Sequence, residues 1–105
     1  MENQPKPFKL KFHTKALKEW KKLDHDAQAA FKKKLTKLVN RTETPTPRNA
    51  LSGFPDGYFK IKLRKKGYRL VYRRDKGELI VLVLAVGRRD RNTVYDAARE
   101  RLLGK

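Results

Sequence analysis

Two clusters of positively charged side chains carry the most distinctive chemistry of this sequence. Residues 60–64 alternate cations with apolar residues, and Arg69 follows a few positions later. A second basic run, Arg88–Arg91, precedes Tyr95. Lys and Arg side chains bind phosphate, and a tyrosine ring can stack on a nucleotide base. The combination predicts a site for an extended polyanion, and RNA is the leading candidate.

The alternation places the cations on one surface. Successive side chains of a strand point to opposite faces, so Lys60, Lys62 and Arg64 share a face while the apolar residues between them turn to the core. Neighbours on that face lie roughly 6.5–7 Å apart, which is close to the spacing of phosphates along an extended single strand. Arg69, on the partner strand, comes alongside Lys60 or Lys62, depending on the register.

The same patterns also have structural interpretations. A solvent-facing strand uses lysine to prevent edge-to-edge pairing, and Tyr95, in the first turn of a helix, can be a core aromatic. Further candidates for contacts with RNA are Lys32, Lys33, Lys34, Lys37, Arg64, Lys65, Arg88 and Arg91. The four lysines among residues 32–37 could equally form the solvated face of a helix.

The charge balance favours a polyanionic partner. The chain has 105 residues, with 28 Lys and Arg against 11 Asp and Glu, and a formal net charge of +17. Such an excess raises the affinity for phosphate backbones and exceeds what solubility requires. Residues 58–91 hold 12 basic and 3 acidic residues, so charge is concentrated in the segment that carries the candidate site.

Composition also argues against several chemistries. The absence of cysteine excludes disulfides, thiolate zinc sites and cysteine nucleophiles. His13 and His25 lie outside the basic clusters, and the carboxylates show no two-metal pattern, so we expect no metal and no cofactor. No apolar run reaches the roughly 18 residues of a membrane span, and the N-terminus lacks a secretory signal. We therefore expect a soluble, cytoplasmic protein that does not bind membranes.

Periodicity predicts one α+β domain over residues 8–105, preceded by a flexible N-terminal segment at residues 1–7. The expected element order is β-α-α-β-β-β-α: a small antiparallel sheet of about four strands, packed with an N-terminal helical hairpin and a C-terminal helix. The strands are expected at about 8–13, 58–64, 68–74 and 79–86. The last is apolar on both faces, which predicts a central strand.

Caps and turns mark the boundaries of these elements. Thr14 can cap the first helix, and Asp24 or Asp26 the second. Gly67 and Gly77 fall at the two hairpin turns, where a positive φ is often needed.

Four runs of the sequence together resemble the RelE toxins of bacterial toxin–antitoxin modules. They are 16–23 (ALKEWKKL), 60–64 (KIKLR), 67–72 (GYRLVY) and 86–91 (VGRRDR), the last followed by Val94-Tyr95. They occur in order and with near-constant spacing over roughly residues 8–104. The resemblance implies a RelE-like fold and an endoribonuclease that cuts mRNA in the ribosomal A site, in contact with 16S rRNA.

Five residues match the catalytic positions of that family: Lys60 and Lys62 as the lysine pair, Arg69 as the phosphate-binding arginine, Arg89 as the second arginine, and Tyr95 as the C-terminal tyrosine. Two departures accompany the match. Ser52 stands where a basic residue often precedes the glycine, and the segment 57–59 is one residue longer than in related sequences.

The residues are compatible with attack by the ribose 2′-hydroxyl on the adjacent phosphate, because the RNA then supplies the nucleophile. Lysine is a poor base at its reference pKa near 10.4, so orientation of the mRNA and stabilisation of the phosphate by cations would supply much of the rate. Either Lys60 or Lys62 could be the base.

The resemblance also implies a partner. This partner is an acidic RelB-like antitoxin that wraps the toxin. Together the two proteins repress their shared operon, and the antitoxin makes the contacts with operator DNA. Two alternatives stay open from the residues alone. One is a non-catalytic basic nucleic-acid-binding module, and the other is a degenerate toxin that acts only as a corepressor.

Overall fold

A computed structural model describes residues 7–41, 44–88 and 93–102 of the chain. The elements in chain order are β1 Lys9–Phe12, α1 Thr14–Lys21, α2 His25–Val39, the short 3-10 helix η1 Pro47–Asn49, β2 Tyr58–Leu63, β3 Tyr68–Asp75, β4 Ile80–Arg88 and α3 Thr93–Leu102. This confirms the predicted order. A flexible N-terminal segment was predicted for residues 1–7. Of these, residues 1–6 lie outside the described residues.

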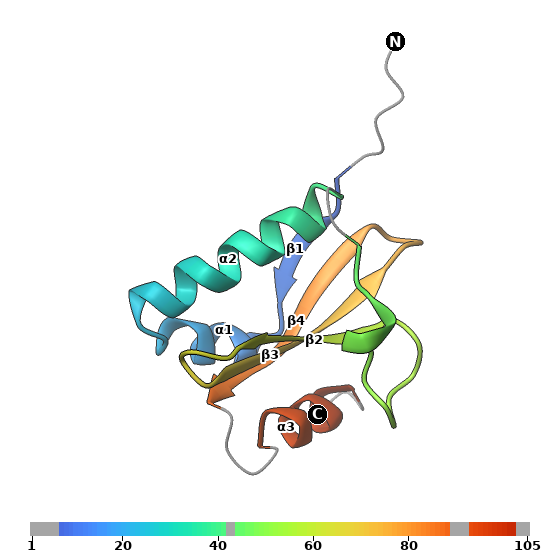
Figure 1. The fold of residues 1–105 in the computed structure, drawn as a ribbon. Helices are drawn as coiled ribbons and strands as arrows, with labels where there is room; N and C mark the ends of the chain where they lie inside the picture. The colour runs from blue at the N-terminus through green and yellow to red at the C-terminus, as the bar shows by residue number, and fades with distance from the viewer. Residues whose placement is uncertain (1–6, 42–43, 89–92, 103–105) are drawn as a thin grey trace.

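The four strands form one sheet in the order β1-β4-β3-β2. Helices α1 and α2 cover one face of it and α3 covers the other (Figure 1). The sheet is mixed rather than wholly antiparallel, because β1 runs parallel to β4 while β2–β3 and β3–β4 are antiparallel. The alternation of residues 8–13 indicated a strand but not its direction. The central position predicted for β4 is confirmed.

Side-chain caps set the starts of the first two helices. Asp24, one of the two predicted candidates, caps α2, and its Oδ1 accepts the Ala27 amide hydrogen bond at 2.7 Å. The cap of α1 is His13 rather than Thr14, because Thr14 is already helical and the His13 Nδ1 accepts from the Lys15 amide at 3.2 Å.

The two hairpin turns differ from each other. Gly67 has a φ of 69°, as expected for the β2–β3 turn. Gly77 does not have a positive φ, and in the β3–β4 turn Leu79 does, at 58°. The Asp75 side chain closes this turn by accepting the Glu78 amide at 3.0 Å, so the left-handed residue comes two positions after the glycine.

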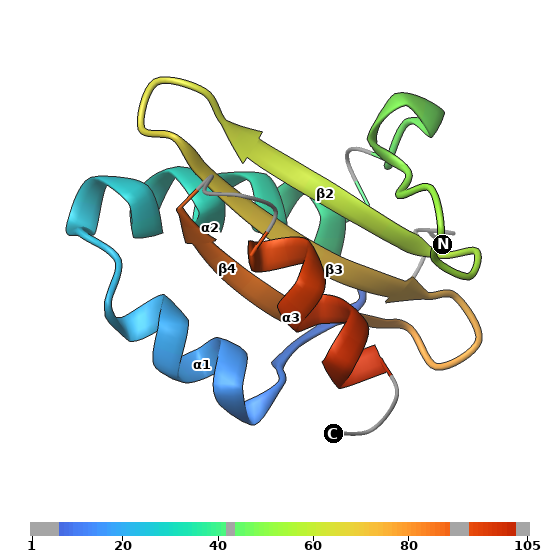
Figure 2. The same cartoon turned by 90° about the horizontal axis from the view of Figure 1, so that it is seen from below.

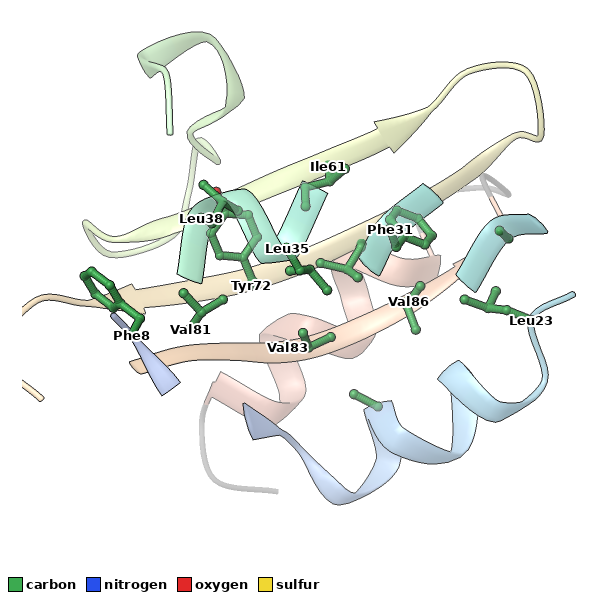
Figure 3. Packing of buried hydrophobic residues seen from close by; sticks show 13 residues of the cluster. Phe8, Leu23, Phe31, Leu35, Leu38, Ile61, Tyr72, Val81, Val83 and Val86 are labelled. Atoms are coloured by element: carbon green, nitrogen blue, oxygen red, sulfur yellow. The ribbon is translucent and has the colours of Figure 1, made fainter. Parts of the chain in front are cut away.

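The main core lies between α2 and the sheet. Figure 3 shows Phe31, Leu35 and Leu38 of α2 directed at the sheet residues, among which Tyr72 and Val83 are fully or almost fully buried. These α2 positions follow the helical period, so one face is apolar and the other carries the lysines.

A smaller core lies under α3, and a bulge in β4 supplies part of it. Val71 pairs with Ala85 and Tyr72 pairs with Val83, so Leu84 is an extra residue in β4. Leu84 and Ala85 therefore both belong to the cluster on the α3 side of the sheet. This cluster brings α3 onto the face that carries the predicted cations.

Candidate polyanion site

Two cations on neighbouring strands lie directly opposite each other. Lys62 of β2 is the register partner of Arg69 of β3, whereas Lys60 faces Val71. Directly opposed residues have Cβ atoms about 4.5–5.5 Å apart, and like charges there are destabilising. A sequence that keeps such a pair departs from the local rules of sheet stability, which is typical of a ligand site.

The surroundings of Arg69 connect this pair to α3. On its other side Arg69 pairs with Gly87, which has no side chain to crowd it. The Arg69 guanidinium carbon lies 5.4 Å from the centroid of the Tyr95 ring. The Arg69 Nε is buried and has no hydrogen-bond partner, as is also true of the Arg73 Nε.

Tyr95 combines the two interpretations that its position allowed. Its ring is half-buried and packs against the small core under α3, as a structural aromatic would. The same ring also lies beside Arg69, so one side chain both anchors the helix and adds an aromatic surface to the basic site.

Two cavities adjoin Lys62. The larger, of about 500 Å³, lies along the outer edge of β2, and the smaller, of about 300 Å³, lies at the β2–β3 hairpin. The cations that line one or both are Lys34, Arg48, Lys60, Lys62, Arg64 and Arg69. None of the described lining residues is acidic, so the electrostatic potential of both cavities favours anions.

The structure gathers only part of the predicted binding set. Lys34 reaches the larger cavity, but Lys32, Lys33 and Lys37 are exposed on α2 and do not line it. Arg88, at the end of β4, lies over the ring of Tyr68 at 5.9 Å, and Lys65 is exposed in the hairpin turn. The predicted Arg89 and Arg91 lie outside the described residues.

Arg48 was not among the predicted residues. It lies in η1, after Pro45 and Pro47, in a segment that has no helical or strand periodicity to show where its side chain points. The chain then returns to pair with β2, since the Leu51 amide donates to the Tyr58 carbonyl at 3.1 Å. This contact brings η1 to the edge of β2, and the basic residue with it.

Residues 7–41, 44–88 and 93–102 contain no group of three or more His, Asp or Glu side chains that could hold a metal ion. None of their helices is both long and apolar enough to cross a membrane.

Comparisons with known proteins identify the family of this chain's relatives. The family described as "ParE toxin of type II toxin-antitoxin system, parDE" matches residues 10–93. The mRNA interferase toxin RelE of Escherichia coli K12 is 45% identical over 94 residues, which cover 90% of this chain and 96% of the relative. The mRNA interferase RelE of Shigella flexneri has the same identity and coverage.

Solved structures show the same fold. A mutant of the E. coli toxin RelE in the free state aligns with a TM-score of 0.79 and 38% identity, covering 91% of this chain and 98% of that one. The toxin in the intact E. coli RelBE toxin–antitoxin complex aligns with a TM-score of 0.71 and 39% identity, covering 80% and 99%.

Proposed function

This chain belongs to the RelE/ParE family of toxins from type II toxin–antitoxin systems, and from that premise we propose that it is a ribosome-dependent endoribonuclease. Its substrate would be mRNA in the ribosomal A site, and its action there would inhibit translation in the cytoplasm. The relatives named mRNA interferase support this activity. The observation that carries the proposal is the cluster of Lys62, Arg69 and Tyr95 on one face of the sheet.

The proposed reaction needs no nucleophile from the protein. The ribose 2′-oxygen attacks the adjacent phosphorus in line, and its proton passes to Lys60 or Lys62. The bond from phosphorus to the 5′-oxygen breaks, and that oxygen takes a proton from water. The products are a 2′,3′-cyclic phosphate and a 5′-hydroxyl. Cations around the phosphate stabilise the extra negative charge of the transition state, so the route needs no metal ion or cofactor.

Each side chain has a role that its position allows. The Arg69 guanidinium, which lines the hairpin cavity beside Lys62, would bind the phosphate. An arginine cannot serve as the general acid without deprotonating, which its very high pKa opposes. Tyr95 would hold a nucleotide base against its ring or assist the leaving oxygen. Arg89 is proposed as the second phosphate contact from the match to the family alone.

The proposed partner is an acidic RelB-like antitoxin. The relative in the RelBE complex is bound to its antitoxin, and a net charge of +17 favours a polyanionic protein as well as RNA. An antitoxin bound across the basic face would compete with mRNA. The complex would also repress the operon through contacts of the antitoxin with operator DNA.

The test is to sequence the 5′ ends of transcripts after the protein is expressed in a host. We expect cuts within translated codons, and expect Arg69→Ala and Arg89→Ala to remove them. Arg74→Ala is the matched control, because Arg74 lies on the same strand and over an aromatic ring, that of Phe8 at 5.1 Å. Unchanged cutting by both site variants would contradict the proposed site.

The same experiment separates the two alternatives. A non-catalytic nucleic-acid-binding module would leave 5′ ends unchanged while the purified protein still bound RNA. A degenerate toxin would also leave transcripts intact but would tighten operator binding by the antitoxin. Coexpression of the antitoxin should restore growth only if the chain is an active toxin.

A further inference from the structure

A sheltered ion pair joins α3 to α1. The two terminal nitrogens of Arg101 donate to the two carboxylate oxygens of Glu19, each at 2.8 Å. The Arg101 side chain is 9% exposed and that of Glu19 is 31% exposed. A bidentate pair of this kind fixes the orientation of both side chains, because two parallel hydrogen bonds form only in one geometry.

The same two side chains also hold the bulged part of β4. Arg101 Nη1 donates to the Leu84 carbonyl at 2.8 Å, and the Val86 amide donates to Glu19 Oε1 at 3.2 Å. A bulge interrupts the hydrogen-bond ladder of a strand. Glu19 and Arg101 therefore satisfy backbone groups at the bulge while they tie it to both helices.

Apart from this pair, α3 is held by packing, with Tyr95 half-buried in the small core and Arg99 lying over the Phe54 ring at 5.1 Å. Of its ten residues, only Val94 and Ala98 are buried, and both side chains are small. Figure 2 shows α3 lying across β3 and β4. The pair formed by Arg101 and Glu19 adds a directional contact at the C-terminal end of the helix that carries Tyr95.

We propose that Glu19 and Arg101 are positioning residues for the ribonucleolytic site. They fix the placement of α3, and through it the Tyr95 ring, without touching RNA. This inference rests on the proposed function, because it assigns the pair a role in that reaction. The matched control is Asp96, whose pair with Arg99 at 3.6 Å lies on the same helix but is largely exposed.

The experiment measures kcat and KM for cleavage of ribosome-bound mRNA at a temperature where every variant is folded. Glu19→Gln should lower kcat on the order of 10- to 100-fold, as small misplacements of catalytic groups do, with little change in KM. Arg101→Gln should behave alike, and Arg101→Lys should recover part of the loss. Asp96→Asn should match the wild type.

A double variant distinguishes positioning from a general loss of stability. If Glu19 acts through Tyr95, adding Glu19→Gln to Tyr95→Ala should lower kcat no further than Tyr95→Ala alone. Independent, multiplicative losses would overturn the proposal, as would an unchanged kcat in both Glu19→Gln and Arg101→Gln.

Hydrogen exchange of the α3 amides, measured without RNA, separates this inference from the proposed function. Glu19→Gln should speed exchange in α3 and leave α2 unchanged. If the wild type cuts no mRNA, the proposed function fails and the catalytic role of the pair fails with it. Unchanged α3 exchange in an active enzyme overturns the pair's role alone.

Discussion

The Arg69 guanidinium carbon lies 5.4 Å from the centroid of the Tyr95 ring, and this contact links the sheet to the C-terminal helix. The ring face attracts the cation, a contact worth about 0.5–1 kcal/mol at an exposed site. Arg69 also lines the hairpin cavity together with Lys62. The contact with Tyr95 therefore orients the guanidinium beside that cavity.

Substitution of Tyr95 should separate the roles of ring and hydroxyl. Tyr95→Phe keeps the ring, so kcat on programmed ribosomes should stay close to that of the wild type. Tyr95→Ala removes a base-stacking surface worth about 1–3 kcal/mol that orients the reacting nucleotide, so kcat should fall about 5- to 150-fold by the same range. Equal losses of kcat in both variants would contradict a stacking role and would point to the hydroxyl.

Neutralising Lys62 should raise stability and lower activity together. Lys62→Gln removes a like-charge pair with Arg69, which should add up to about 1 kcal/mol to the free energy of unfolding. The gain should shrink at high salt, because ions screen exposed charges. Urea unfolding measures the change in the free energy of unfolding, and mRNA cleavage measures the loss of activity.

The control for this charge effect is Lys66→Gln. Lys66 lies near Asp24 and Asp26, at 3.7 and 3.6 Å, so its removal deletes attraction rather than repulsion. Lys66→Gln should leave stability unchanged or slightly reduced. A gain of equal size in both variants would mean that net charge, and not the pair with Arg69, sets the effect.

Local sequence patterns were sufficient to predict the helices and strands and part of the candidate site. Strand alternation placed Lys60 and Lys62 on one face, and the helical period placed the lysines of α2 outward. The register that sets Lys62 against Arg69 was not predictable, because it depends on the geometry of the hairpin turn. The bulge at Leu84 was equally hidden, since an apolar run gives no sign of an extra residue.

Contacts between distant segments could not be predicted from the sequence. Glu19 and Arg101 lie 82 positions apart, and the local pattern around each one indicates only a charged side chain on an amphipathic helix. Arg48 belongs to an irregular loop, where no period predicts direction. The parallel pairing of β1 with β4 depends on the path of α1 and α2 between them, which alternation within one strand cannot reveal.

Acid should loosen the start of α1 through His13. Its Nδ1 accepts the Lys15 amide hydrogen bond, so only the neutral imidazole caps the helix. Burial, followed by the positive charges of Arg101 and Lys15, lowers the pKa of His13 below 6.5, although Glu19 opposes this. The unfolded chain then binds a proton more readily than the native one. The stabilisation is complete above the unfolded pKa of 6.5 and is lost as the pH falls through the lower native pKa.

Urea unfolding midpoints measured between about pH 8 and pH 5 test whether stability falls on acidification. The variant His13→Ser can cap the helix without titrating in that range, so its midpoint should fall less on acidification. A pH profile that is identical in the two proteins would show that other groups cause the acid sensitivity.

Arg48 should contribute to RNA binding without taking part in the chemistry. It lines the larger cavity together with Lys60 and Lys62, but lies on η1 at the edge of the sheet. Arg48→Ala should weaken binding of single-stranded RNA uniformly across sequences and lower the salt slope of the affinity by about 1. Cleavage at saturating programmed ribosomes should stay at the wild-type rate. Arg74→Ala, which removes an arginine that lies over Phe8 and outside this cavity, should leave the salt slope unchanged. An equal change of slope in both variants would reflect net charge alone, and a fall in the saturated rate for Arg48→Ala would move this residue into the catalytic set.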